Sequence, residues 1–443
     1  MAITNDDLKR KIRDLERKND TLARENKYLK KLTSSRRFYF AEKIATTYNV
    51  FFPVSTKRRL VFEGAGKKVK NILSIRKKRK IKKDIKKIAE LAKNYKKVIV
   101  LNSIPFDVKL KQRPHHLASE FSKKDFFVVY LEYDNPVKRF RIIKDNLITV
   151  NSDFYIIELP TLCKDCYFLT PNNMPTEFAT LKRICDAGYK LIYDYLDEFH
   201  EDIAGDLSIQ REVWDKLKIL NPVLCVATAQ RLYDDLRDHL GKNQKIIIAK
   251  NAVNIDHFDF TKNETETPPF DLKPAVETKN PIIGFYGALA PWIDFELLNQ
   301  VAANHPEWEF VYLGIDYNGA AIDLKSAKNV HNLGAKNYET LPKYAKFFNC
   351  AIIPFRKGEI AKATSPVKLF EYMAAGLPTV CTRDLQECEG FDYVYIAKDD
   401  NEFEKDLAKA IAAYNDVVAR QKLLTQAEEN TWESRTRDII NAL

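Results

Sequence analysis

Residues 365–378 read Ser-Pro-Val-Lys-Leu-Phe-Glu-Tyr-Met-Ala-Ala-Gly-Leu-Pro. This stretch predicts a helix with Ser365 as its N-cap and Pro366 in its first position, closed by the glycine. The unpaired N–H groups at such a helix start bind phosphate, and Lys368 adds a full charge. Glu371 follows the cap by about 9 Å, roughly the step from a diphosphate to a ribose diol, in what we expect to be a solvent-lined cleft. The alternative is an ordinary amphipathic helix.

Apolar runs alternate with helical patterns on both sides of this stretch. The runs are continuous and β-branched, which is typical of parallel strands covered on both faces. We therefore expect an α/β protein with two Rossmann-like domains, 97–265 and 281–425, facing one cleft. Residues 261–280, with three prolines, are interpreted as a linker, and 426–443 as a helix that crosses back. The predicted strands are 98–102, 127–131, 156–159, 191–193, 223–227, 245–249, 282–286, 310–313, 330–333, 350–354, 378–380 and 393–396.

Residues 1–32 carry a heptad repeat. Its d positions are Leu8, Leu15, Leu22 and Leu29, and its a positions are Asn5, Ile12, Asn19 and Asn26. Leucine at d with asparagine at a favours a parallel two-stranded coil, because paired asparagines satisfy each other and penalise other registers. We therefore predict self-association as a parallel homodimer through this segment. A single amphipathic helix packed on the body of the protein is the alternative.

Residues 33–96 form a basic, aromatic and helical connector. From residue 57 to residue 97 there are 18 Lys/Arg and three Asp/Glu, a net of +15 that leaves −4 for the rest of the chain. Aromatic and basic residues together suit an anionic membrane surface. A solvated connector and a nucleic-acid patch are the alternatives. We expect no nucleic-acid partner, because the basic helix follows the heptads, whereas in leucine-zipper transcription factors it precedes them.

Three features predict a cytoplasmic protein, peripheral on the inner face of the cell membrane. The N-terminus is polar and acidic, unlike a secretory signal. No stretch approaches the roughly 18 apolar residues that span a bilayer. The seven cysteines are an odd number at irregular spacings, which suits a reducing compartment. Cys163 and Cys166 form a lone C-x-x-C in a predicted loop, without the second pair that a structural zinc site needs.

Polar motifs also follow predicted strands of the first domain. They are Gln112-Arg-Pro-His-His-Leu-Ala118, Tyr193-Asp-Tyr-Leu-Asp-Glu198 and Asn251-Ala-Val-Asn-Ile-Asp256. Since strand carboxyl ends meet at the cleft, we expect Arg113 there to bind phosphate, and Asp194 and Asp197 to reach the reacting groups. N-capping by the aspartates and packing of one histidine are the alternatives.

The 365–378 stretch resembles the donor-binding helix of GT-B glycosyltransferases, especially retaining family 4 and enzymes that build teichuronic-acid-type and other surface polysaccharides. The three first-domain motifs agree with this resemblance. It implies a nucleotide-sugar donor, no metal or other cofactor, and retention of anomeric configuration. Two departures stand out. Ala363 replaces the first of the family's paired glutamates, and the loop 287–294 lacks the family's Arg and Lys, so Lys368, the helix start and Arg356 or Lys357 supply the positive field.

The positions of the candidate residues after strand ends, together with the resemblance, suggest their roles. The predicted catalytic residues are Asp197, Asp194 and Lys368; the predicted donor-binding residues are Glu371, Ser365, Pro366, Lys368, Arg113 and Gly287; and the predicted acceptor or sugar contacts are His115, His116 and His200. The expected acceptor is a lipid-linked cell-surface glycan or teichoic-acid-type intermediate. The alternatives are an inactive relative that acts as an oligomeric scaffold, and a protein O-glycosyltransferase.

Overall fold

The computed structural model describes residues 81–108, 111–132, 140–259 and 267–443. The predicted coiled coil and most of the basic connector lie outside these residues. Residues 81–92 are helical, with Ile88 and Ala92 buried and Lys86 and Lys87 exposed. None of the described helices is long and apolar enough to cross a membrane.

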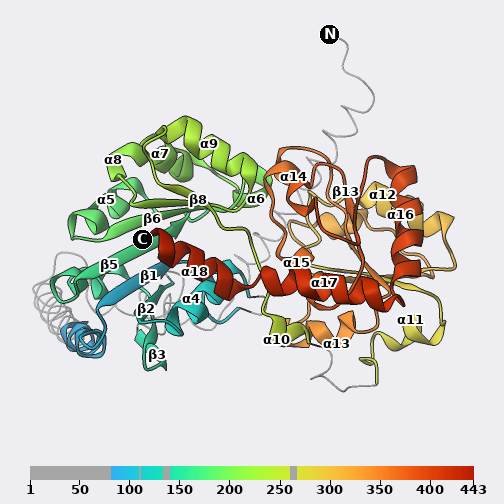
Figure 1. Ribbon diagram of the computed structural model, residues 1–443, viewed down its shortest axis with the longest axis horizontal. Helices are drawn as coiled ribbons and strands as arrows, with labels where there is room; N and C mark the ends of the chain where they lie inside the picture. The colour runs from blue at the N-terminus through green and yellow to red at the C-terminus, as the bar shows by residue number, and fades with distance from the viewer. Residues whose placement is uncertain (1–80, 109–110, 133–139, 260–266) are drawn as a thin grey trace, which may run out of the picture. The chain divides into compact units, whose positions relative to one another are not determined.

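An eight-stranded sheet organises the first domain (Figure 1). Its strands, in sheet order, are β3 (Phe140–Lys144), β4 (Leu147–Val150), β2 (Phe126–Leu131), β1 (Lys97–Asn102), β5 (Asp165–Pro171), β6 (Lys190–Tyr195), β7 (Leu224–Ala227) and β8 (Ile246–Ile248). Neighbours run parallel, except that β3 is antiparallel to β4. The helices are α4 (Arg113–Ser122), α5 (Phe178–Asp186), α6 (Glu201–Ala204), α7 (Ser208–Asp215), α8 (Leu217–Leu220) and α9 (Gln230–Leu240). β2 is fully buried and β1 is buried from Val98 onward, which explains their continuous apolar sequences.

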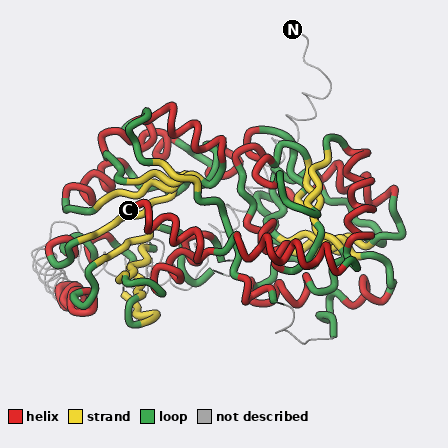
Figure 2. The backbone as a smooth tube through the Cα atoms, viewed as in Figure 1, coloured by secondary structure: helices red, strands yellow, loops and turns green. Residues whose placement is uncertain are grey.

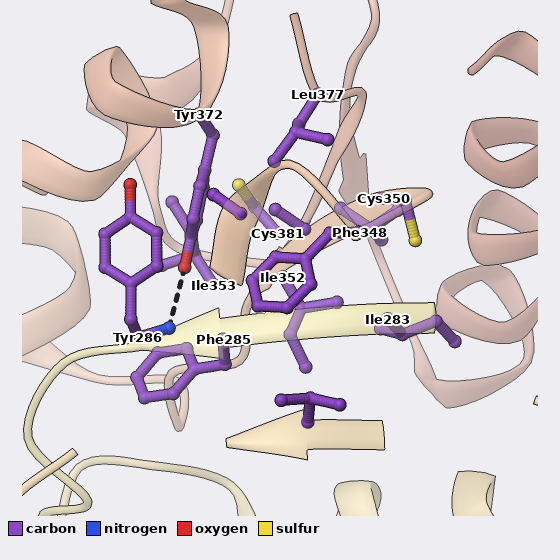
Figure 3. Close-up of a cluster of buried hydrophobic side chains, with 14 of the residues drawn as sticks. Ile283, Phe285, Tyr286, Phe348, Cys350, Ile352, Ile353, Tyr372, Leu377 and Cys381 are labelled. Carbon is purple, nitrogen blue, oxygen red and sulfur yellow. Dashed lines mark hydrogen bonds between the residues drawn. The ribbon is translucent and has the colours of Figure 1, made fainter. Parts of the chain in front are cut away.

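A six-stranded, wholly parallel sheet organises the second domain (Figure 2). Its order is β11 (Val330–Asn332), β10 (Glu309–Leu313), β9 (Ile282–Tyr286), β12 (Cys350–Ile353), β13 (Thr379–Thr382) and β14 (Val394–Ala397). Its helices are α11 (Lys273–Glu277), α12 (Phe295–Asn304), α13 (Leu341–Ala345), α14 (Glu359–Ala363), α15 (Val367–Ala374) and α16 (Asp400–Ala413). Phe348 packs directly on β9, where a Cβ at Gly284 would lie 1.9 Å from its ring (Figure 3). Glycine is therefore required at that position.

The C-terminal helices connect the two domains. α17 (Val417–Glu429) packs on α15, whereas α18 (Trp432–Ala442) packs on α4 of the first domain. Trp432 and Ile439 belong to the first domain's core. The connection between α17 and α18 also contacts the segment that follows β8, because Thr431 forms a β-bridge with Val253. Val253 lies just before α10 (Ile255–Phe258). The final segment therefore crosses back, and its turn lies at 430–431 instead of 426.

Three predictions about secondary structure differ from the structure. The predicted strand 156–159 is absent: residues 156–158 form turns between two 3₁₀ helices, Asp153–Tyr155 and Leu159–Thr161, and Leu159 begins the second helix. The strand that lies between β1 and β6 in the sheet is β5. The predicted loop around Cys166 is part of β5, because its Tyr-Phe-Leu run is buried between β1 and β6. The predicted linker also contains α11, which places Ala275 in the second domain's core.

Candidate functional site

A cavity of about 660 Å³ lies at the carboxyl ends of the strands of both sheets. The first domain contributes the segments after β1, β5 and β6, and the second contributes the segment after β9 and the start of α15. Ligands of parallel α/β sheets bind at this edge, where strand ends leave a crevice between loops. The residues that line the cavity include Ser103, Arg113, Asn173, Asp197, Asn251, Tyr286, Gly287, Ser365, Pro366, Lys368 and Glu371.

The start of α15 forms one wall of the cavity. Pro366 is the N-cap, and the helix itself begins at Val367. Proline has no side-chain acceptor, so the N–H groups of Val367 and Lys368 keep their capacity to bind an anion, whereas that of Leu369 donates to the Pro366 carbonyl at 3.1 Å. The prediction that Ser365 caps this helix is wrong. Its hydroxyl accepts a hydrogen bond from the Asn251 N–H at 3.1 Å, and its carbonyl accepts one from Asn251 Nδ2 at 2.6 Å, so Ser365 joins the donor helix to the chain that leaves the first domain.

Lys368 and Gly287 lie together in this wall. The Lys368 ammonium lies over two aromatic rings, 5.4 Å from the Phe285 centroid and 5.3 Å from that of Phe355. Burial lowers the pKa of Lys368 to about 8, and the nearby Glu371 charge opposes that shift. Gly287 has φ +143°, and a Cβ there would lie 2.8 Å from Lys368 Cε. Gly287 thus leaves the space in which the lysine stem reaches the cavity.

Glu371 is buried, with only 4% of its surface exposed. Burial raises its pKa to about 7, and the shift is opposed by the Lys368 charge and by the hydroxyls of Tyr286 and Tyr338. The expectation of a solvent-lined position is therefore wrong, because aromatic residues of β9 and of the 3₁₀ helix Tyr338–Thr340 pack around the carboxylate. Charged Glu371 costs folding energy that an exposed glutamate would not.

Arg113 and Asp194 form a buried bidentate ion pair. Arg113 Nε donates to Asp194 Oδ2 at 2.9 Å and Nη2 donates to Oδ1 at 3.2 Å, and both side chains are at most 3% exposed. Arg113 Nη1 also donates to the Lys250 carbonyl at 3.2 Å. Burial raises the pKa of Asp194 although the guanidinium opposes it. Arg113 lines the cavity with its donors engaged, whereas Asp194, which it pairs with, is absent from the cavity lining within the described residues.

Asp197 lines the cavity from the first domain. Asn173 Nδ2 donates to Asp197 Oδ2 at 3.0 Å. Asn172 holds the backbone of the same loop, since its Oδ1 accepts from the Leu196 N–H at 2.9 Å and its Nδ2 donates to the Asp197 carbonyl at 2.8 Å. Burial raises the pKa of Asp197 to about 6. Neither asparagine was predicted, although an Asn-Asn pair directly after a strand is the available signal.

None of the three histidines predicted as acceptor or sugar contacts is among the described residues that line the cavity. His115 is buried at the start of α4, where it accepts from the Gln112 N–H at 3.1 Å and lies 3.1 Å from the Pro105 carbonyl. His116 stacks on Trp432 at 4.8 Å, and burial lowers its pKa to about 3. His200 caps α6 by accepting from the Asp202 N–H at 3.2 Å. Each imidazole therefore has a local packing or capping role.

Contacts between the domains surround the cavity. The carboxylate of Glu387 accepts from the Gln230 N–H at 2.7 Å and pairs with Lys250 at 2.7 Å, and Arg231 pairs with Glu359. These contacts were not predicted, because each joins residues more than a hundred positions apart. In the part of the chain that the structure describes, no group of three or more His, Cys, Asp or Glu side chains is placed to hold a metal ion.

Comparison with solved structures identifies the architecture. The sucrose-phosphate synthase of Thermosynechococcus elongatus matches with a TM-score of 0.58 and 13% identity, over 78% of this chain and 98% of its own. Anabaena HepE, solved in complex with UDP and glucose, matches with a TM-score of 0.52 and 13% identity, over 78% of this chain and 98% of its own. This chain has the GT-B fold.

Sequence comparison shows what the second domain is similar to. Residues 280–414 match the family model described as "Glycosyl transferases group 1". The teichuronic acid biosynthesis glycosyltransferase TuaH of Bacillus subtilis (strain 168) is 22% identical over 267 residues, which are 56% of this chain and 62% of the relative. The match therefore spans less than two thirds of that relative. The matched residues include β9, α15 and their cavity residues, so the second domain is similar to group 1 glycosyltransferases in the part that forms the cavity wall.

Proposed function

We propose that this GT-B protein transfers a sugar from a nucleotide-sugar to an acceptor. The observation that carries the proposal is the arrangement on one cavity wall of an anion-binding helix start, a partly buried ammonium and a buried carboxylate. Glu371 follows Val367 by one helical turn, roughly 6 Å. The wall therefore offers donors for a diphosphate and, one turn further along, an acceptor for ribose hydroxyls.

Each donor contact follows from the chemistry of its residue. The N–H groups of the first turn of α15 and the Lys368 ammonium hold the diphosphate, and Gly287 lets the chain approach it closely. Glu371 accepts hydrogen bonds from the ribose. Lys368 and the helix dipole supply positive charge where the leaving diphosphate gains negative charge, so we propose a reaction that needs no metal ion.

Asp197 is proposed as the acidic contact of the transferred sugar or of the acceptor hydroxyl. Its loop belongs to the first domain, across the cavity from α15, and Asn173 orients one carboxylate oxygen. With a pKa of about 6, most of it is ionised at pH 7 and accepts a hydrogen bond. We propose retention of anomeric configuration, in keeping with the resemblance of the donor helix to retaining enzymes.

The acceptor we propose is a lipid-linked cell-surface glycan or teichoic-acid-type intermediate. The similarity to TuaH, whose name places it in teichuronic acid biosynthesis, supports this class. The basic segment 33–96 would hold the enzyme at an anionic membrane on its cytoplasmic side, and residues 1–32 would make it a parallel homodimer. Replacing Arg76–Lys80 with serines should reduce flotation with anionic liposomes, and unchanged flotation would contradict the membrane role.

Binding and turnover with a panel of nucleotide-sugars test the proposal. The matching donor should stabilise the protein, by about 2.7 kcal/mol at a hundredfold excess over Kd, and should release its nucleoside diphosphate when acceptor lipid is added. Lys368→Met, which keeps the length of the stem but removes the charge, should weaken binding of the nucleoside diphosphate. Stabilisation without turnover in any acceptor extract would favour the inactive scaffold. A panel without any binding would refute the donor site.

A further inference from the structure

Two buried tyrosines flank the carboxylate of Glu371. Tyr286 ends β9 and is 3% exposed, and Tyr338 begins a 3₁₀ helix and is 4% exposed. Among the described residues, neither hydroxyl has a partner at full hydrogen-bond geometry, yet both interact with the Glu371 carboxylate. A buried hydroxyl that lacks a well-placed partner costs about 1–3 kcal/mol. Two such hydroxyls beside one carboxylate are therefore candidates for a role at that carboxylate.

Packing holds both rings in place. The Tyr286 ring lies 4.7 Å from the Tyr372 ring at 66°, and the Tyr286 N–H donates to the Tyr372 hydroxyl at 3.0 Å (Figure 3). The Tyr338 ring stacks on His257 at 4.2 Å and meets the edge of His116 at 5.5 Å. His116 belongs to the first domain, so Tyr338 also connects the donor site with that domain. Neither hydroxyl can swing away without disturbing a packed ring.

The charged and titratable groups around Glu371 are few. On its own helix these are Lys368 and Tyr372, while β9 and the 3₁₀ helix contribute Tyr286 and Tyr338. The other elements that pack on α15 contribute His257 of α10, Arg420 of α17, Cys381 of β13 and, from the segment after β13, Cys388. Of these groups, Lys368 and the two tyrosine hydroxyls oppose the effect of burial on Glu371. Lys368 is committed to the donor phosphates under the proposed function, which leaves the hydroxyls to support the carboxylate.

We propose that Tyr286 and Tyr338 are positioning residues for donor binding, whose buried hydroxyls hold the Glu371 carboxylate in its orientation toward the donor ribose. This inference rests on the proposed function. Tyr286 lines the cavity, whereas Tyr338 acts through Glu371 from outside the cavity lining. A protonated Glu371 would offer one acceptor fewer and no charge, so donor affinity should fall as pH drops through the pKa of Glu371, which is about 7.

Removing either hydroxyl should raise the pKa of Glu371. The pH below which donor affinity falls, which we call the acid limb of the binding profile, should then move upward. We expect a shift of about one pH unit for Tyr286→Phe or Tyr338→Phe, which corresponds to one charge-assisted hydrogen bond. Binding should then be about tenfold weaker than wild type at pH 6 and within about twofold at pH 8.5. The alkaline limb, set by Lys368 with its pKa of about 8, should stay in place.

Calorimetric titration with UDP, GDP, ADP and CDP between pH 5.5 and 9 measures these limbs. The matched control is Tyr312→Phe, because Tyr312 is 1% exposed and its hydroxyl also lacks a partner among the described residues, while burial alone raises its pKa. The control should bind as wild type does at every pH. Melting temperatures of all variants identify any variant with a damaged fold. If one tyrosine variant is damaged in this way, the acid limb of the other variant tests the positioning role.

The outcomes separate the two proposals. If wild type binds none of the four nucleoside diphosphates, the proposed function fails, and this inference fails with it. If wild type binds but both tyrosine variants keep its acid limb, only the positioning role is refuted. Weakening that is equal at all pH values, or a shift of the same size in Tyr312→Phe, would also refute it, because a merely structural role predicts those results.

Discussion

Replacing Glu371 with glutamine should stabilise the fold while it weakens donor binding. Glu371 is 4% exposed, and burial raises its pKa from an ordinary 4.5 to about 7. At pH 8.5 the native protein must keep this carboxylate charged inside the fold, at a cost of about 3 kcal/mol relative to the unfolded chain. Glutamine removes the charge, keeps the shape, and can exchange hydrogen bonds with Tyr286 and Tyr338. The cost should therefore largely disappear.

The stabilisation should depend on pH in a defined direction. Between pH 4.5 and 7 the folded protein binds more protons at Glu371 than the unfolded chain does, so this group makes wild type less stable as pH rises. Glu371→Gln should raise the melting temperature by about 5 °C or more at pH 8.5 and by little at pH 5. In the same variant, binding of the nucleoside diphosphate should weaken by about a hundredfold, because charge-assisted hydrogen bonds are lost.

Scanning calorimetry at both pH values, paired with titration of the nucleotide, measures these effects. The matched control is Glu387→Gln, which neutralises a carboxylate of equal exposure that pairs with Lys250 and should lower the melting temperature. An unchanged or lower melting temperature of Glu371→Gln at pH 8.5 would refute the reasoning. A gain of the same size at pH 5 would show that packing, and not charge, caused the stabilisation.

Three further changes have defined outcomes. Gly287→Ala should weaken nucleotide binding about tenfold in calorimetry, because φ is +143° and the new Cβ would meet Lys368 Cε at 2.8 Å; wild-type affinity would contradict this role of glycine. Asn173→Ala should raise the pKa of Asp197 further above about 6 and move the acid limb of turnover upward, with nucleotide affinity unchanged. Deleting residues 1–32 should leave a monomer that still binds donor, and light scattering that shows a dimer would contradict the coiled coil.

Buried strands were the most predictable part of the fold. The runs at 98–102 and 282–286 match β1 and β9 to within a residue, because strands covered on both faces need continuous apolar residues. β5 was missed, since its apolar centre is only three residues long between polar ends, and its burial depends on β1 and β6 on either side. The apolar run at 156–159 had no strand partner in the sheet, so it formed turns.

The candidate site was predictable where one helix carries it. Val367 to Glu371 lie within a single turn, so local spacing alone places Lys368 and Glu371 on one segment. The orientation of the histidines after β1 was not predictable, because local spacing does not say which neighbours the side chains at a helix start will contact. His115 and His116 turn toward Tyr130 and Trp432, and Trp432 lies over three hundred residues away in the chain.

The sequence by itself determined the two-domain α/β architecture, the glycosyltransferase resemblance and the helix that carries the donor residues, because all three depend on short-range patterns of apolar, capping and charged residues. Only the tertiary structure decided the electrostatic state of the site. It paired Arg113 with Asp194 across 81 positions, used Ser365 as a link to Asn251, and buried Glu371 between two tyrosines. Burial and ion pairing arise from segments that meet only after folding, and a pKa depends on those neighbours.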